Sequence, residues 1–366
     1  MPGMGASIYL KVASWHHYSK ITMNVHFFVT FAKDAYNSPF AQALREQGID
    51  FRIFSEQISL RYAIRAWLYI VGWPRMIAFA FRQSSRSLSA TPKADWVVVQ
   101  SHFDILAMSI LSVLLFRKKP KLMLLGFIYT RRKSVWVSKL KQYYFSLIIW
   151  LADCVVCHSR LEVEDNRVFF KTSASKFVYI PYGLHVAVPD IEETDTAPAP
   201  YALSAGRSGR DYDLLIKVFT ALGYPLHIVC DSVSAVSDQG LPDNIKVLRS
   251  HYGGEYIKEI ALAKLVIIPI AVDDISAGQM VLLQAMALHK PVIITDTPST
   301  RLYCEHRKTA LMIEKNSLVE MRAAVEVLWV DERLAENLAE NGFVHFNSQH
   351  SMAVFVKNIC DVLKGF

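Results

Sequence analysis

The chain has 366 residues, of which 52% are hydrophobic and 20% are charged. This balance excludes a disordered or low-complexity chain, and the length favours two domains. The net charge of +7 is unevenly divided, because residues 1–185 carry 24 Lys and Arg against 10 Asp and Glu, whereas residues 186–366 carry 16 against 23. The basic first half therefore predicts a negative partner, which could be anionic lipid, nucleic acid or a phosphorylated substrate.

The sequence predicts neither a membrane-spanning helix nor a signal peptide. Its longest apolar runs, Phe103–Phe116 and Phe145–Cys157, are shorter than the about 18–20 residues that a spanning helix needs. Lys11, His16 and Lys20 interrupt any apolar core of a signal peptide at the N-terminus. Five cysteines, an odd number, favour a reducing compartment. We therefore expect a cytoplasmic protein.

Short apolar strands alternate with helical patterns along the first half, which is typical of a parallel, doubly wound sheet. A helix is expected over 39–47, because Ser38 is a good N-cap, Pro39 suits a first helical turn and Gly48 can end it. The expected strands are Met23–Phe31, Ile49–Phe54, Trp96–Gln100, Leu122–Ile128, Cys154–Cys157 and Phe177–Ile180.

A second alternation follows an acidic segment rich in Pro and Ala at 186–200, which is typical of an interdomain linker. The expected strands are Tyr201–Ala205, Leu226–Cys230, Ile245–Leu248, Leu265–Ile270, Pro291–Thr295 and Leu311–Ile313. The expected helices span 211–222, 254–263, 279–288, 317–330, 332–341 and 351–363.

The predicted organisation is an N-terminal Rossmann-like domain over 1–185 and a C-terminal Rossmann-like domain over 201–347. The last helix, within 348–366, is expected to pack back toward the N-terminal domain. Ligands of such sheets bind at the carboxyl ends of the strands, so we expect the site in the loops that follow them.

Several motifs of the second half follow predicted strands or helices: Ser204-Ala205-Gly206-Arg207, Arg210, Gln284-Ala285-Met286-Ala287 and Lys290-Pro291-Val292-Ile293. They resemble the C-terminal domain of GT-B-fold glycosyltransferases of the family 4 type. Ile180-Pro181-Tyr182-Gly183, and Ser159 with Glu162, fit the same pattern. The resemblance implies an α/β GT-B fold, in which two Rossmann-like domains with parallel sheets face a central cleft. It also implies a nucleotide-sugar co-substrate and no metal.

In this resemblance, the diphosphate of the donor would be bound by Arg207 and Arg210, with Arg210 in place of the usual Lys. Both arginines follow the strand Tyr201–Ala205 and precede the helix over 211–222, whose amino end favours anions. A second phosphate contact is expected at the start of the helix over 279–288, where glycine lets backbone N–H groups approach a phosphate. The residues there are Ser276, Ala277, Gly278 and Gln279.

Two glutamates that the family carries eight residues apart are replaced here by Ser276 and Gln284. Gln284 can still hydrogen-bond ribose hydroxyls, whereas Ser276 cannot replace a carboxylate that holds the donor sugar. Asp273 or Asp274 is the candidate replacement. Tyr252 follows another strand and is placed near the nucleotide base.

The candidate catalytic residues of the first half are His102, Asp104 and Asp34, which follow predicted strands. His102 and Asp104 would position the acceptor, and either carboxylate could act as the base of an inverting reaction. The resemblance implies a retaining reaction instead, in which Arg207 and Arg210 stabilise the leaving group. Both stereochemical outcomes remain open at this point.

Two basic segments rich in aromatic residues, Arg61–Arg82 and Arg131–Trp150, suit helices that lie in a membrane interface. The leading hypothesis is therefore a glycosyltransferase on the inner face of the cytoplasmic membrane. It would move a sugar from a UDP-sugar, or second a GDP-sugar, to a glycan or lipid-linked glycan of a bacterial-type surface polysaccharide or glycolipid. An inactive or epimerase-like GT-B protein that binds nucleotide or glycan is one alternative. A basic nucleic-acid-binding protein is the other, and the aromatics beside apolar runs favour lipid over nucleic acid.

Overall fold

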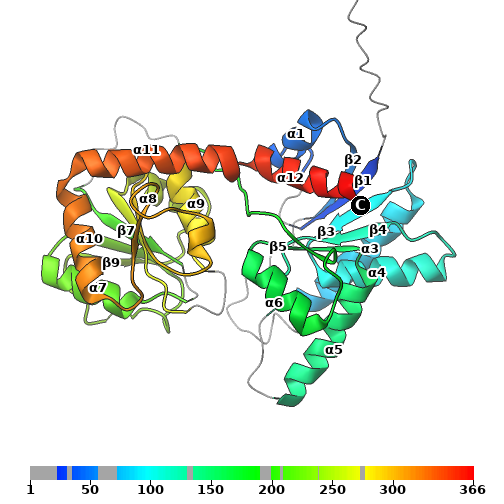
Figure 1. Cartoon of the computed structure of the whole chain (residues 1–366), viewed down its shortest axis with the longest axis horizontal. Coiled ribbons are helices and arrows are strands. Elements are labelled where there is room, and N and C mark those ends of the chain that lie inside the picture. Colours follow the sequence, from blue (N-terminus) through cyan, green and yellow to red (C-terminus); the bar gives the residue numbers. More distant parts are fainter. Residues whose placement is uncertain are drawn as a thin grey trace, which may run out of the picture.

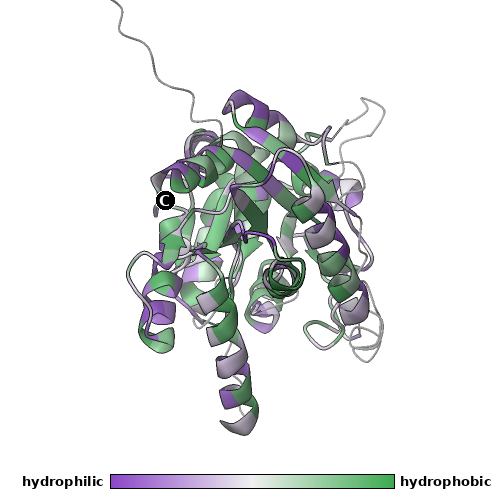
Figure 2. Cartoon of the chain, turned by 90° about the vertical axis from the view of Figure 1, so that its right-hand side faces the viewer, coloured by the Kyte–Doolittle hydropathy of each residue, from purple (hydrophilic) through white to green (hydrophobic). Residues whose placement is uncertain are grey.

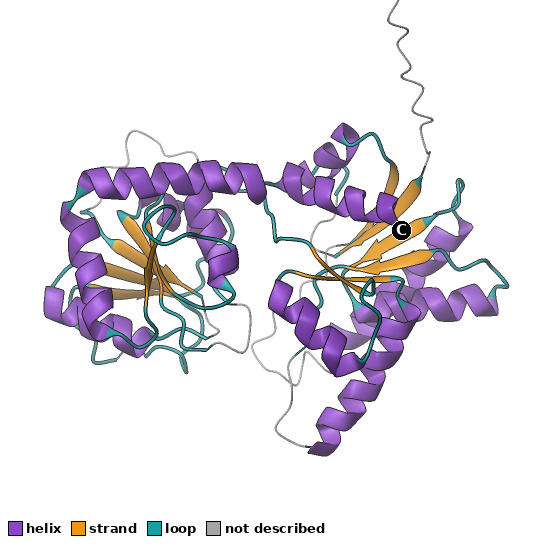
Figure 3. Ribbon diagram, viewed as in Figure 1, coloured by secondary structure: helices purple, strands orange, loops and turns teal. Residues whose placement is uncertain are grey.

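The computed structural model describes residues 23–30, 35–56, 72–129, 135–189, 199–206, 209–237, 239–272 and 277–366. They form two α/β units, each built on a six-stranded sheet with helices on both faces (Figures 1 and 3). All strand pairs in both sheets are parallel. The fold class predicted from the alternation of strands and helices is therefore confirmed.

The first sheet has the strand order β2-β1-β3-β4-β5-β6. Its strands are β1 (Asn24–Val29), β2 (Asp50–Ser55), β3 (Trp96–Val99), β4 (Lys121–Leu124), β5 (Cys154–Cys157) and β6 (Phe177–Tyr179). Its helices are α1 (Pro39–Glu46), α3 (Trp73–Ser89), α4 (His102–Leu114), α5 (Val135–Leu151) and α6 (Arg160–Phe170). Helix α1 covers one face, and buried side chains of α3, α4 and α5 pack on the other.

The second sheet has the strand order β12-β11-β10-β7-β8-β9. Its strands are β7 (Ala202–Ala205), β8 (Leu226–Val229), β9 (Ile245–Leu248), β10 (Leu265–Ile268), β11 (Val292–Thr295) and β12 (Leu311–Ile313). Its helices are α7 (Tyr212–Leu222), α8 (Gly254–Leu262), α9 (Gln279–Ala287), α10 (Leu318–Val330) and α11 (Glu332–Gln349). The central strands are buried on both faces, which explains why they read as continuous apolar runs.

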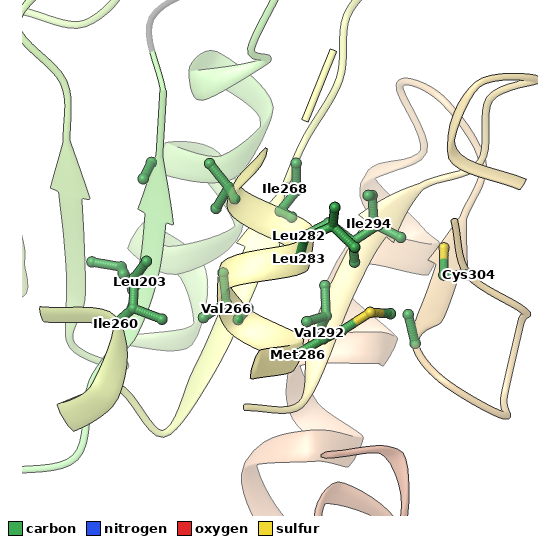
Figure 4. Packing of buried hydrophobic residues seen from close by; sticks show 14 of the residues in the cluster. Leu203, Ile260, Val266, Ile268, Leu282, Leu283, Met286, Val292, Ile294 and Cys304 are labelled. Atoms are coloured by element: carbon green, nitrogen blue, oxygen red, sulfur yellow. The ribbon is translucent and has the colours of Figure 1, made fainter. Parts of the chain in front are cut away.

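Helix α9 lies across the middle of the second sheet. Its Leu282, Leu283 and Met286 pack against Val266 and Ile294 of the strands beneath (Figure 4). This contact fixes the amino end of α9 at the carboxyl edge of β10, which is where the sequence predicts a phosphate contact.

Two predicted boundaries are wrong. The helix expected to end at Asn341 continues to Gln349, because Gly342 is a close-packing residue and not a helix stop. A Cβ at Gly342 would lie 3.2 Å from Cγ of Met286. The strand expected to reach Ile128 ends at Leu124, and Gly126 then turns with a φ of +77° beside the ring of His158.

The chain returns to the first unit at its end. Helix α12 (Met352–Gly365) packs against α1, and its Phe355, Ile359 and Leu363 belong to the core of the first sheet. Figure 1 shows α11 and α12 running one after the other across both units.

One buried tyrosine ties the two units together. The Tyr303 hydroxyl donates to the carbonyl of His158 at 2.6 Å and accepts the N–H of Tyr182 at 3.1 Å. Its ring also stacks on His350, whose backbone carbonyl accepts the N–H of Leu184. Tyr303, a residue of the second unit, therefore contacts the first unit at His158. It also contacts both segments of the chain that pass between the units, at Tyr182 and at His350.

Candidate donor site

The turn between β7 and α7 holds a cation against the backbone. Gly206 adopts a φ of +116°, and a Cβ there would lie 2.7 Å from Nη2 of Arg210. Nε of Arg210 donates to the carbonyl of Ala205 at 3.0 Å. Only glycine leaves room for this guanidinium to fold back over the end of the strand.

Backbone pairing holds Arg210 in place from the other side. The N–H of Asp211 donates to Pro269 O at 3.1 Å, and Ala271 N–H donates to Gly209 O at 2.9 Å. Asp211 also caps α7 through its side chain, which accepts the N–H of Leu214. Burial lowers the pKa of Arg210, so its charge lies in poorly solvated surroundings where an anion would stabilise it.

The start of α9 leaves the backbone open to a ligand. Gly278 is its N-cap with a φ of +86°, and a Cβ there would lie 2.9 Å from Cγ2 of Ile268. No described side chain caps this helix start. The buried Nε2 of Gln279 finds no hydrogen-bond partner among the described residues. Backbone N–H groups and a buried amide thus meet at one helix terminus, a favourable arrangement for a phosphate.

Gln284 is held by a tyrosine that the sequence did not indicate. The Tyr256 hydroxyl donates to Oε1 of Gln284 at 3.0 Å, and Tyr256 lies near the Arg210 guanidinium. Burial raises the pKa of Tyr256, so it remains a hydrogen-bond donor. The available signal was its position on the helix that begins at Gly254, one turn after Tyr252.

Tyr252 follows β9 on the same edge of the sheet and is 41% exposed. Its loop is braced on the loop after β8, since Ser250 N–H donates to Asp231 and Nη2 of Arg249 donates to Val236 O at 2.8 Å. Arg207, Asp273, Asp274 and Ser276 lie outside the described residues. The described part of the predicted donor site comprises Gly206, Arg210, Tyr252, Ala277, Gly278, Gln279 and Gln284.

At the corresponding edge of the first sheet, His102 packs among aromatic side chains. Nδ1 of His102 hydrogen-bonds the Tyr144 hydroxyl at 2.7 Å, and the ring contacts Phe103 and Phe145. Burial lowers the pKa of His102. Asp34, the third catalytic candidate, lies outside the described residues.

Asp104 is 1% exposed and serves the start of α4. Its carboxylate accepts the backbone N–H of Ser101, while the Ser101 hydroxyl accepts the N–H of Phe103 at 3.2 Å. This reciprocal arrangement is a capping box. Burial raises the pKa of Asp104 to about 7, and its Oδ1 finds no partner among the described residues. The cap gives Asp104 a structural role at the start of this helix.

The described residues contain neither a candidate metal centre nor a membrane-spanning helix. No three or more His, Cys, Asp and Glu side chains there form a group that could hold a metal ion. No helix there is both long and apolar enough to cross a bilayer.

Residues 199–345 match the family model "Glycosyl transferases group 1". The C-terminal half of this chain is thus similar to the glycosyl transferases group 1 family. No curated protein matches the chain at a significant level.

The fold is that of GT-B glycosyltransferases, as three solved structures illustrate. Sucrose-phosphate synthase from Thermosynechococcus elongatus is similar with a TM-score of 0.66 at 14% identity, over 94% of this chain and 98% of that one. Anabaena Alr3699/HepE in complex with UDP has a TM-score of 0.61 at 13% identity, over 94% and 100%. WaaG, a glycosyltransferase involved in lipopolysaccharide biosynthesis, has a TM-score of 0.59 at 13% identity, over 93% and 100%.

Proposed function

We propose that this protein transfers a sugar from a nucleotide-sugar, with UDP as the preferred nucleotide and GDP as the second choice, to a glycan or lipid-linked glycan. The observation that carries the proposal is the edge of the second sheet, where the half-buried Arg210 over Gly206 and the glycine-capped start of α9 offer charge and N–H groups to a diphosphate. Alr3699/HepE, which shares the fold, has been solved with UDP and with UDP-glucose, which supports this choice of ligand.

In the proposed reaction the leaving diphosphate carries the developing negative charge. Arg210, with Arg207, would stabilise that charge, and preorganised cations of this kind lower the barrier without a protein nucleophile. Gln284 would hydrogen-bond the ribose from an orientation fixed by Tyr256. Asp274 would hold the sugar, and Tyr252 would lie against the base. A retaining outcome, as the resemblance implies, belongs to this proposal.

A nucleotide-binding protein without transfer activity is the second candidate. It is favoured by one observation: the amide of Gln284, at a position where the family has a carboxylate, is already engaged by Tyr256. The two candidates differ in one measurable respect, since only the enzyme releases UDP from a UDP-sugar when an acceptor is added.

The acceptor is proposed to be presented at the inner face of the cytoplasmic membrane. Helix α5 carries Lys139 and Lys141 among mostly apolar residues; Ile148 and Ile149 are buried in the first unit, whereas Trp136 and Trp150 are 83% and 74% exposed. Leu140, Tyr143 and Leu147 complete an exposed stripe with spacings of three and four residues. An exposed apolar stripe favours a partner, and aromatic side chains beside lysines suit a lipid interface.

Vesicle flotation tests the membrane part of the proposal. Replacing Trp136 and Trp150 together by Ser is expected to lower vesicle binding about tenfold or more, because two interfacial aromatic anchors are lost. Val330→Ser with Val344→Ser removes exposed apolar side chains from the second unit and serves as the matched control. Equal losses in both pairs would exclude α5 as the membrane face.

Calorimetric titration with UDP, GDP and ADP tests the donor site. One diphosphate is expected to bind, and Arg210→Ala to weaken it at least about fivefold, the loss of one charge-assisted hydrogen bond. Arg333→Ala removes an exposed arginine on α11 and controls for net charge. If no diphosphate binds the wild-type protein, the donor-site assignment is wrong.

A further inference from the structure

A cavity lies at the edge of the first sheet where its strands begin, opposite the edge at which His102 follows β3. It has a volume of about 1310 Å³ and is bounded by the segments that lead into β1, β2, β3 and β4 and by the last residues of α12. Strand starts and strand ends lie at opposite edges of a parallel sheet, so this cavity is remote from the proposed donor cleft.

The cavity is strongly basic. Its lining holds six cationic side chains, which are Lys93, Arg117, Lys118, Lys119, Lys121 and Lys364. Asp95 is the one carboxylate side chain among the lining residues, and its Oδ2 already accepts the N–H of Asn24 at 2.9 Å. Like charges gathered around one cavity repel one another unless an anion lies between them.

Helix capping explains half of these cations. Lys93 donates to Leu88 O at 2.7 Å, and Lys119 donates to Leu151 O at 2.6 Å, so each satisfies a carbonyl at a helix end. Lys121 likewise donates to Phe366 O at 2.8 Å. For Arg117, Lys118 and Lys364 no hydrogen bond or ion pair of the side chain is found within the described part of the chain, so capping does not account for them.

An apolar surface adjoins the charge. Phe116 lines the cavity, has a φ of +50° and is 97% exposed. The three residues before it on α4, Val113, Leu114 and Leu115, are exposed as well. Figure 2 views the molecule from the side of the first unit, and green, hydrophobic ribbon is seen on that side. Four consecutive exposed apolar side chains directly precede the basic run from Arg117 to Lys121.

We infer that this cavity binds several phosphate groups at once, between Arg117, Lys118 and Lys364. Such phosphates could belong to adjacent anionic lipid head groups, whose hydrocarbon would lie along Phe116, or to a soluble polyphosphate. The inference does not depend on the donor site, because no residue is shared between the two.

Binding of vesicles and of inorganic tripolyphosphate to the full chain tests the inference. The variant Arg117→Ala/Lys118→Ala is expected to weaken both ligands about 10- to 30-fold, since each basic side chain near a phosphate surface contributes about a fivefold factor. The control pair Lys217→Ala/Lys246→Ala removes the same charge from exposed positions of the second unit and is expected to change either affinity less than about twofold. Because tripolyphosphate could also enter the donor site, its binding is measured in the Arg210→Ala background.

The variant Phe116→Ser distinguishes a lipid head group from a soluble polyphosphate as the source of the phosphate. If a lipid head group is the ligand, this variant weakens binding to phosphatidylglycerol vesicles about five- to tenfold and leaves tripolyphosphate unchanged. If a soluble polyphosphate is the ligand, Phe116→Ser changes neither. The inference is overturned if neither ligand binds at physiological salt, if the control pair loses as much as the cavity pair, or if duplex DNA binds more tightly than both.

Discussion

The carboxyl edges of the two sheets carry different kinds of structure, although both sheets have six parallel strands. On the second sheet, Gly206 and Gly278 adopt positive φ and let a guanidinium and a helix start approach the strand ends. On the first sheet, His102 packs among aromatic rings and Asp104 is used to cap a helix. Among the described residues, the second edge therefore presents a cation and a helix start, whereas His102 and Asp104 on the first edge are engaged by their neighbours.

This difference explains why the sequence motifs concentrate in one half. A phosphate requires particular backbone conformations, which restrict residue identity to glycine at fixed positions. Aromatic packing accepts many combinations of side chains of similar volume, so it leaves no comparable motif. The edge of the first sheet is therefore harder to recognise from the sequence than the edge of the second.

The largest effect is expected at Gly278. Gly278→Ala places a Cβ 2.9 Å from Ile268 Cγ2 at a φ of +86°, and should lower the free energy of unfolding by about 3 kcal/mol. Gly126→Ala, on the first edge, meets only the movable ring of His158 at 3.2 Å and should cost about 1–2 kcal/mol. Gly223→Ala, with a φ of +71° and open space, is the matched control at about 1 kcal/mol. Urea unfolding measures all three, and equal costs would contradict the packing argument.

A pH-dependent effect is expected at Asp104. Its pKa is raised from 3.8 to about 7 by burial, so between these values the folded state holds a proton that the unfolded state lacks. Stability should therefore fall as pH rises through this window, by up to about 1.4 kcal/mol per pH unit, and level off above pH 7.

Asp104→Asn removes this titration. The difference in unfolding free energy between wild type and Asp104→Asn, measured in urea at pH 5 and pH 7, isolates it from buried histidines such as His26 and His350, whose pKa values of about 4 are lowered by burial. A difference that does not change with pH would mean that the carboxylate is ionised in the folded protein.

A smaller effect is expected where the two units meet. Tyr303→Phe keeps the ring on His350 but leaves the Tyr182 N–H and the His158 carbonyl without their shared hydroxyl. The expected loss is about 1.5 kcal/mol of unfolding free energy. Tyr224→Phe, whose ring stacks on Trp329, is the control and should be nearly neutral. Equal stability of the two variants would show that the hydroxyl does not hold the units together.

The smallest effect concerns the orientation of Gln284. Tyr256→Phe removes the hydroxyl that donates to Gln284 Oε1 and should weaken UDP binding about fivefold, or about 1 kcal/mol. The protein should remain folded, because the phenyl ring keeps its packing. Calorimetry against the Tyr224→Phe variant measures the change, and unaltered affinity would separate Tyr256 from the donor site.

The sequence correctly predicted every strand of both sheets, because buried parallel strands are continuous apolar runs between turn residues. It failed at Gly342, where Asn-Gly reads as a turn. Nor does the sequence indicate that His289, just after α9, adopts a φ of +51° with its ring stacked on Phe343 at 3.6 Å between ring centroids.

The amino-acid sequence by itself determined the α/β alternation, the glycine-rich turns of the second half and the uneven charge, since each follows from residues near one another in the chain. Only the tertiary structure decided that Tyr256 orients Gln284, that Tyr303 joins the units and that six cations share one cavity. These arrangements bring together residues as much as 271 positions apart, since Lys93 and Lys364 line the same cavity. Local periodicity carries no information about such pairs, because folding and not the local pattern brings them together.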